Sequence, residues 1–151
     1  MDDILKDNTD LQKNNTYLNQ SLSVYDTAIE LGKLLQDYKG GDAVVLDLRN
    51  LNGWTDYFVI ATVTSNTHLQ GLERHIKEFS REKGLDILRI SQRPKGEPLF
   101  SEDEWLVIDL GTIVVHLMSS KTRTFYELER LWSAAAIIFQ ENPAAVSLRD
   151  A

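Results

Sequence analysis

The chain contains no cysteine, so neither a disulfide nor a thiolate metal site can form. The same absence is typical of proteins that work in a reducing compartment. No apolar run reaches the roughly 20 residues that a membrane-spanning helix needs. The chain starts with MDDILKDNTDLQKNN, in which no basic region leads into an apolar stretch, and this excludes a typical secretory signal. We therefore expect a cytoplasmic protein without membrane contact.

Basic side chains are also scarce, with 16 Lys and Arg against 23 Asp and Glu, and the formal net charge is −7. Nucleic acids are bound largely by Lys and Arg that neutralise phosphates, so we expect little direct contact with RNA. An acidic chain is better suited to a basic protein partner, because complementary charge speeds their encounter. The alternative, that the charge serves only solubility, stays open.

The 151 residues, of which 42% are hydrophobic, suit one domain with a substantial core. Residues 1–21 are rich in Asn, Asp, Gln and Thr, which predicts a flexible polar extension. We expect a single domain over 22–140 and a loose tail over 141–151, with no internal repeat.

Periodicity predicts three helices. The first lies within residues 21–41, has Ser23 as its cap and ends at Gly40-Gly41. The second follows Ser65 and ends at Gly84, and the third runs over 120–139. The apolar stripes predicted to face the core are Tyr25, Ala28, Leu31, Leu35 and Tyr38, then Leu69, Leu72, Ile76 and Phe79, and finally Phe125, Leu128, Trp132, Ala135 and Phe139.

Five short apolar runs predict strands, at 43–48, 57–63, 86–91, 105–110 and 113–119. Gly111-Thr112 joins the last two as a hairpin, and the Pro-containing segment 92–104 is expected to be an exposed loop. The order of elements predicts an α/β (α+β) fold, in which helices flank a mixed five-stranded sheet.

The hairpin has two unlike faces. Leu106, Ile108 and Leu110 alternate with Trp105, Val107 and Asp109 along the first strand. On the second strand, Val114, His116 and Met118 share the mixed face. Aromatic residues and Met are enriched at protein interfaces, so this mixed face is a candidate contact surface. The alternative is that a helix covers it and Trp105 anchors a core.

Catalytic chemistry is less well supported. Asp47, Asp56 and Asp109, with His116 nearby, could hold a divalent cation, but no Asp-x-Asp pair and no phosphate-binding Gly-rich loop occur. His116 and His68 lack a recognisable nucleophile partner. On the last helix, Arg123, Glu127 and Arg130 are spaced to form ion pairs that we expect to face solvent.

The segments DAVVLDLRNL, TDYFVIATVTSNTHLQGL and EWLVIDLGTIVVHLMSSKTRTFYELERLW resemble the ribosomal silencing factor, or Iojap-related, family over about residues 24–139. The resemblance implies a nucleotidyltransferase-like topology without the catalytic carboxylates, and a non-enzymatic role without metal or cofactor. It implies binding to protein fourteen of the large ribosomal subunit, which blocks joining of the small subunit and lowers translation when nutrients are scarce. A homodimer is implied as well.

The resemblance also implies a contact surface centred on Trp105. Its expected members are Trp105, Leu106, Val107, Asp109, Val114, His116, Met118 and the corner formed by Thr55, Asp56 and Tyr57. The residues before 22 and the long loop at 92–104 depart from the family pattern. Two other classes compete with this interpretation: a metal-dependent nucleotidyltransferase-like enzyme and a dimeric adaptor without ribosome contact.

Overall fold

The structure is a computed structural model that describes residues 24–51, 53–91 and 102–141. Several expected features lie outside these residues. They are the extension over 1–21, the Ser23 cap, most of the 92–104 loop and most of the 141–151 tail. Within the described part of the chain, no helix is both long and apolar enough to cross a membrane.

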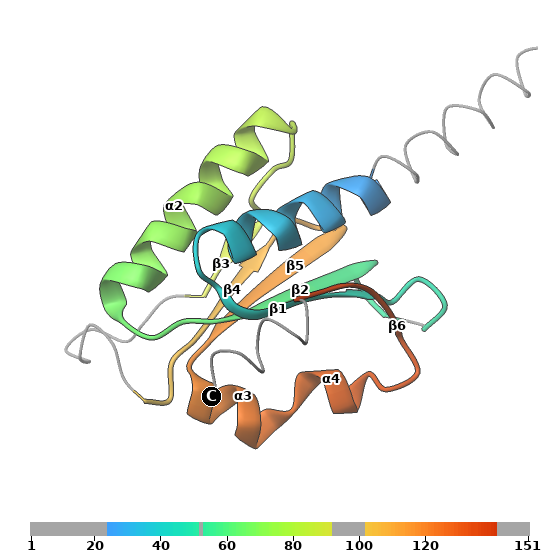
Figure 1. The fold of residues 1–151 in the computed structure, drawn as a ribbon. Helices are drawn as coiled ribbons and strands as arrows, with labels where there is room; N and C mark the ends of the chain where they lie inside the picture. Colours follow the sequence, from blue (N-terminus) through green and yellow to red (C-terminus); the bar gives the residue numbers. More distant parts are fainter. Residues whose placement is uncertain (1–23, 52, 92–101, 142–151) are drawn as a thin grey trace, which may run out of the picture.

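A mixed sheet organises the fold (Figure 1). Its strands are β1 (Gly41–Asp47), β2 (Tyr57–Thr62), β3 (Arg89–Ile90), β4 (Trp105–Asp109), β5 (Ile113–Met118) and β6 (Ala136–Gln140). Their spatial order is β3-β4-β5-β2-β1-β6, in which β2 and β5 pair in parallel and the other neighbours pair antiparallel. The predicted α+β class with a mixed sheet is confirmed, but the described residues form six strands rather than five.

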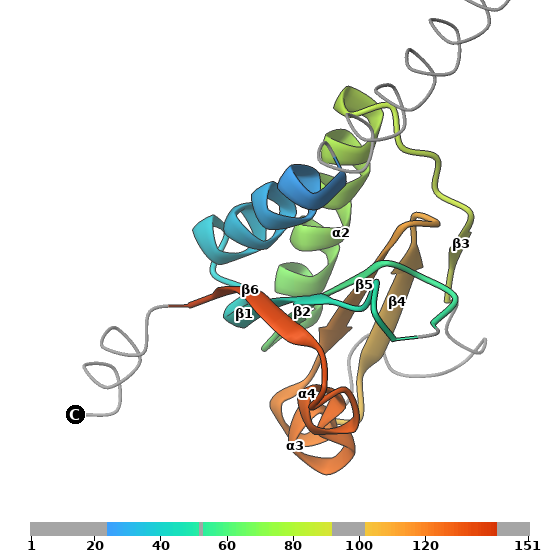
Figure 2. The ribbon, with the colours of Figure 1, turned by 90° about the vertical axis from the view of Figure 1, so that its right-hand side faces the viewer.

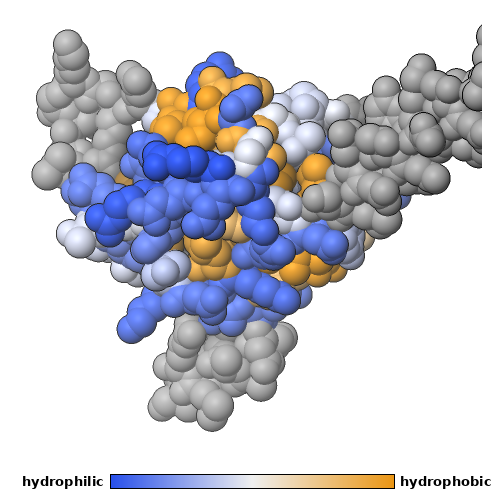
Figure 3. Space-filling model, turned by 90° about the horizontal axis from the view of Figure 1, so that it is seen from above, coloured by the Kyte–Doolittle hydropathy of each residue, from blue (hydrophilic) through white to orange (hydrophobic). Residues whose placement is uncertain are grey.

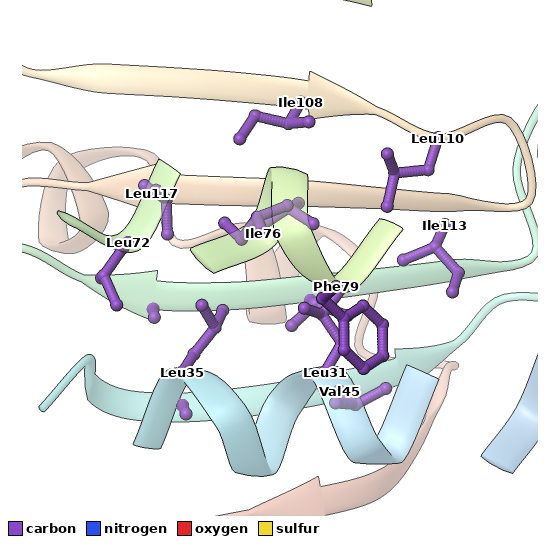
Figure 4. Packing of buried hydrophobic residues seen from close by; sticks show 14 of the residues in the cluster. Leu31, Leu35, Val45, Leu72, Ile76, Phe79, Ile108, Leu110, Ile113 and Leu117 are labelled. Carbon is purple, nitrogen blue, oxygen red and sulfur yellow. The ribbon is translucent and has the colours of Figure 1, made fainter. Parts of the chain in front are cut away.

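Two long helices cover one face of the sheet: a helix over residues 24–37 and α2 (Asn66–Glu82) (Figures 1 and 2). Ser65 caps α2 as predicted, because its hydroxyl accepts a hydrogen bond from the backbone N–H of His68 at 3.1 Å. Between these helices and the strands lies the first core, where aliphatic side chains converge (Figure 4). Leu31, Leu35, Leu72, Ile76, Ile108 and Leu117 belong to it. The outer surface over these helices carries many hydrophilic side chains with hydrophobic patches between them (Figure 3).

The opposite face is covered by two short helices, α3 (Ser120–Tyr126) and α4 (Leu128–Leu131) (Figure 2). The predicted single helix over 120–139 is therefore wrong. Glu127 separates the two helices with φ 44° and ψ 57°, a left-handed conformation that ends α3. The break turns the chain back beneath the sheet, so that Leu128 and Trp132 pack against Phe58 and its neighbours in a second core.

After α4 the chain becomes strand β6, which pairs with β1. Ala is a strong helix former, and the Ala-rich stretch before Ile137 favoured a helix in the sequence. β1, however, contributes side chains to both cores and would otherwise leave a row of unpaired N–H and C=O groups at the edge of the sheet. Pairing with β6 satisfies these groups. A long-range contact thus overrides the local helix preference.

Candidate functional site: the outer face of β4

The outer face of β4 consists of Trp105, Val107 and Asp109, and we call these three residues the β4 surface. Each is half-buried, whereas Leu106 and Ile108, which alternate with them, lie in the first core. The predicted alternation of unlike faces is therefore confirmed along β4, whereas every residue of β5 is buried. The aliphatic face supports the sheet, and the β4 surface keeps part of each side chain accessible.

Trp105 is held from two directions. Its indole Nε1–H donates a hydrogen bond to Nδ1 of His116 at 3.0 Å. Its ring also lies 4.9 Å, centroid to centroid, from the ring of Tyr126 on α3. A large aromatic side chain fixed in this way loses little conformational freedom when a partner binds, which favours affinity.

His116 is a buried, neutral acceptor. Burial lowers the pKa of its imidazole to about 4, so the ring is uncharged at neutral pH. Because Nδ1 accepts the bond from Trp105, Nε2 must carry the ring proton. Nε2 is buried and has no hydrogen-bond partner among the described residues. The imidazole also packs edge-on against the Phe58 ring at 4.5 Å. His116 therefore supports Trp105 from beneath and is not placed as a general base.

Six of the ten expected contact residues lie inside the protein. Val114 and Met118 are fully buried and His116 is 6% exposed, because α4 and Trp132 cover this part of the sheet. The sequence analysis left open the alternative that a helix covers this face. For these three residues that alternative is correct. The other buried members are Leu106, Thr55 and Tyr57. None of the six presents a surface to a partner in this conformation.

The corner before β2 is mainly structural. The Thr55 hydroxyl donates to the Gly111 carbonyl at 3.0 Å and ties this corner to the β4–β5 turn. Tyr57 packs beside Tyr25, and burial raises the pKa of its phenol to about 12. Only Asp56 is exposed. The expected residues with accessible surface are thus Asp56 and the β4 surface.

Arg123 differs from its expected role as a solvent-facing charge. Its guanidinium donates to the backbone carbonyls of Gly41 and Asp42 and to the Thr62 hydroxyl, and it also forms an ion pair with Glu129. These contacts tie α3 to one end of β1 and β2. The side chain is only 13% exposed, so the expectation of a solvent-facing residue is wrong. Spacing along a helix could not show this, because the carbonyl acceptors are about 80 residues away in the sequence.

Two aromatic side chains beside Trp105 were not predicted as surface residues. Phe125 is 80% exposed instead of anchoring the last helix, and Tyr126 is 47% exposed. Their ring centroids lie 5.0 Å apart. We call Trp105, Phe125 and Tyr126 the aromatic corner. The sequence contained a signal for Tyr126 alone, because adjacent helical residues point about 100° apart and Phe125 already lay on the expected core stripe.

Two hollows adjoin α3. The smaller, of about 280 Å³, is lined by the aromatic corner together with Asp103, Lys121 and Thr122. The larger, of about 770 Å³, is shared by α3 and the segment after β2, and contains none of the ten expected contact residues. The smaller hollow is therefore the one continuous with the β4 surface.

The candidate metal ligands are separated. Asp47 follows Leu46 of the second core and so points to the first face of the sheet, whereas Asp109 follows Ile108 of the first core and points to the opposite face. Asp47 pairs with Arg49, and the hydrogen bond from that guanidinium lowers the pKa of the Asp47 carboxyl. Asp109 accepts a hydrogen bond from the Gly111 backbone N–H at 2.8 Å. Within 24–51, 53–91 and 102–141, no group of three or more His, Asp or Glu side chains could hold a metal ion.

The sequence and the fold are similar to those of known proteins. The family model "Ribosomal silencing factor during starvation" matches residues 21–150. The chain is 35% identical to the ribosomal silencing factor of Treponema pallidum, over 74% of this chain and 94% of that protein. It is 31% identical to that of Bacillus subtilis, over 67% and 80% of the two chains. The chain therefore belongs to the ribosomal silencing factor family.

A further relative and two solved structures agree with this assignment. The mouse protein "Mitochondrial assembly of ribosomal large subunit protein 1" is 34% identical over 68% of this chain and 43% of its own length. A crystal structure of a Chromobacterium violaceum protein is similar with a TM-score of 0.59 and 30% identity, and covers 74% of this chain and 85% of that one. A Bacillus halodurans protein gives a TM-score of 0.54 at 26% identity, over 74% and 94% of the chains.

Proposed function

We propose that the chain binds the large ribosomal subunit at its protein fourteen through the β4 surface, and that the bound chain sterically blocks joining of the small subunit. The result is lower translation when nutrients are scarce. The observation that carries the proposal is Trp105, a half-exposed indole fixed between His116 and Tyr126. Fixed tryptophans of this kind are frequent centres of binding energy at protein interfaces.

The composition and the family support this proposal. The net charge of −7 suits a basic ribosomal protein and disfavours direct binding to RNA. The matching family is described by its action during starvation, and the mouse relative is named for the large subunit. Occlusion needs no bond chemistry, so the proposed role is non-enzymatic and requires no cofactor. A homodimer and a cytoplasmic location stay predictions.

The nucleotidyltransferase alternative has less support. Its candidate ligands Asp47 and Asp109 lie on opposite faces of the sheet, so they cannot hold one cation between them. No structural observation favours a dimeric adaptor over a ribosome-binding factor.

Co-sedimentation with purified large subunits tests the proposal. We expect Trp105→Ala to weaken binding roughly 30-fold or more, as for a residue central to an interface. The matched control is Tyr38→Ala, which removes an exposed aromatic ring on the opposite face, where it stacks on His75. Circular dichroism shows whether each variant is folded.

The outcomes separate two errors. If Trp105→Ala is folded and binds as tightly as the wild type, the proposed surface is wrong. If the wild-type chain fails to bind large subunits, the proposed function is wrong. In a subunit-joining assay, wild type should reduce the amount of joined ribosomes, and Trp105→Ala should not.

A further inference from the structure

We propose that the larger hollow beside α3 is a binding site for an uncharged nucleoside. The base stacks on Phe125, and the polar groups of the ligand bond to serine and threonine hydroxyls. The inference goes beyond the proposed function and does not depend on it, because it adds a small ligand to the protein partner. It also explains why the ring of Phe125 is 80% exposed and belongs to neither core.

The hollow lies where two neighbouring parallel strands end. β2 and β5 pair in parallel, and the residues that directly follow them line the hollow: Val63 and Thr64 after β2, and Ser119 and Ser120 after β5. From these ends the chain enters α2 on the first face of the sheet and α3 on the opposite face (Figure 2). Open sheets bind ligands at such a point, because connections that diverge to opposite faces leave a crevice at the carboxyl ends of the strands.

The size and the lining of the hollow suit a planar ligand with polar edges. Its volume is about 770 Å³, which lies within the range typical of small-molecule sites. Phe125 supplies an exposed ring, and every nucleobase has a π-face that can stack on such a ring. Exposed hydroxyls also line the hollow, from Thr64, Ser120 and Thr124. Because a hydroxyl both donates and accepts hydrogen bonds, these groups match the edge of a base and the hydroxyls of a sugar.

The charges on the lining favour an uncharged ligand. The lining carries the carboxylate of Glu102 and the ammonium of Lys121, and these two groups form an ion pair at 3.5 Å. The same ammonium also lies 3.5 Å from a carboxylate oxygen of Asp103. A phosphate group would have to compete with these carboxylates for Lys121, and a cation would have to compete with Lys121 for them. A nucleoside avoids both conflicts, so we expect it to be preferred over a nucleotide.

The walls of the hollow are held in place by contacts between distant segments. The backbone N–H of Val63 donates to the Met118 carbonyl at 2.9 Å and joins the ends of β2 and β5. Arg123 donates to the carbonyls of Gly41 and Asp42 and thereby ties α3 to the sheet. Walls fixed in this way need little ordering when a ligand binds, which favours affinity.

The first experiment uses the full chain and defined probes. Adenosine, guanosine, cytidine and uridine are titrated in turn into ¹⁵N-labelled protein, and the backbone amide signals of Thr64, Ser120 and Phe125 are followed by NMR. Ribose, which lacks a base, and adenosine 5′-monophosphate, which adds charge, are the control ligands. We expect at least one nucleoside to shift these three signals saturably, ribose to shift none, and the monophosphate to bind no more tightly than adenosine. The inference is overturned if no nucleoside shifts them, or if the monophosphate binds more tightly.

Variants locate the binding. Phe125→Leu keeps an apolar side chain but removes the stacking ring, and should weaken binding of the nucleoside about fivefold or more. Thr124→Val keeps the shape of the side chain but removes a hydroxyl, and should weaken it about two- to tenfold. The matched control is Tyr126→Leu, because this neighbouring ring lines the smaller hollow and not the larger one. If Phe125→Leu binds as the wild type does, or Tyr126→Leu weakens binding to the same degree, the larger hollow is not the site.

Failure of this inference is distinguishable from failure of the proposed function. The titrations contain no ribosomal subunits, and co-sedimentation with large subunits contains no nucleoside. If the wild type binds subunits but no nucleoside, the inference fails while the proposed function stands. If the wild type does not bind subunits, the proposed function fails, and the titrations still decide whether the larger hollow binds a nucleoside.

Discussion

The two faces of the sheet are buried by different means. On the first face, two long helices enclose an aliphatic core in which Leu31, Ile76 and Ile108 are fully buried. On the second face, short helices α3 and α4 cover only part of the sheet, and Trp105 and Val107 stay half-buried. The buried imidazole of His116 packs beside the second core, whereas the first core is hydrocarbon apart from tyrosine phenols such as that of Tyr57.

This difference separates stability from recognition. Close-packed aliphatic side chains contribute stability without offering a partner any specific group. Half-buried aromatic residues and a buried polar group cost some of that stability, and they present fixed indole and phenol groups at the surface. We infer that the first face mainly stabilises the fold and that the second face, where it is uncovered, carries the function.

Cavity-forming substitutions should show this contrast most strongly. Ile76→Ala in the first core should lower the free energy of unfolding by about 3–5 kcal/mol, because its closed surroundings cannot fill the space. Leu128→Ala, at the edge of the second core, should lower it by only about 2 kcal/mol, because α4 can settle toward the sheet. Urea denaturation measures both values. Equal losses would remove the proposed difference between the faces.

The pH dependence of stability should reflect the burial of His116 beside the second core. Unfolded, His116 takes up a proton near its ordinary pKa of 6.5, but in the folded protein it does so only near pH 4. Between these values the unfolded chain binds more protons, so stability falls as the pH is lowered through this window. The full loss is about 3 kcal/mol, from 2.5 pKa units at about 1.36 kcal/mol each. Above pH 6.5 this contribution is complete.

Urea denaturation at pH 7.5 and at several values down to pH 4.5 checks this expectation. The control is His116→Gln, whose amide oxygen can still accept the Trp105 hydrogen bond but does not titrate. This variant should lose most of the slope between pH 6.5 and 4.5. The Asp47 carboxyl does not contribute to this slope. Its pKa is lowered in the folded protein, so it changes the stability only as the pH falls below the ordinary pKa of 3.8. An unchanged slope in His116→Gln would show that other groups cause the dependence.

The sequence predicted those parts of the fold that depend on local pattern. The strands at 57–63 and 105–110 and the helix after Ser65 occur close to their expected positions, because period-2 and period-3.6 patterns report which residues face a core. The unlike faces of the hairpin were predictable for the same reason. Trp105 could therefore be identified as a candidate surface residue before the fold was known.

The rest depended on contacts between distant segments. The sequence could not show whether Val114 and Met118 face a partner or a helical cover. The answer depends on where the chain turns after α3. That turn occurs at Glu127, a residue type with no special preference for the left-handed conformation. β6 exists because the edge of β1 needs a neighbour, and no local pattern records that requirement.

The smallest expected effect concerns Glu127 itself. Its left-handed conformation is unfavourable for a residue with a Cβ atom by roughly 1–2 kcal/mol, and glycine avoids this cost. Glycine makes the unfolded chain more flexible, and the exposed ion pair of Glu127 with Arg130 is lost, so part of the gain is offset. We expect Glu127→Gly to raise the free energy of unfolding by up to about 1 kcal/mol.

The same substitution in α2, one of the two helices that cover the first face, should change the free energy of unfolding in the opposite direction. Glu78 lies inside α2 with an exposed side chain, and Glu78→Gly should lower stability by about 1 kcal/mol, because glycine is unfavourable in a helix interior. Thermal and urea unfolding of both variants give the comparison. If Glu127→Gly is destabilising to the same degree as Glu78→Gly, then residues 120–131 behave as a continuous helix in solution. Glu127 would then not be the residue at which the helix breaks and brings Leu128 beneath the sheet.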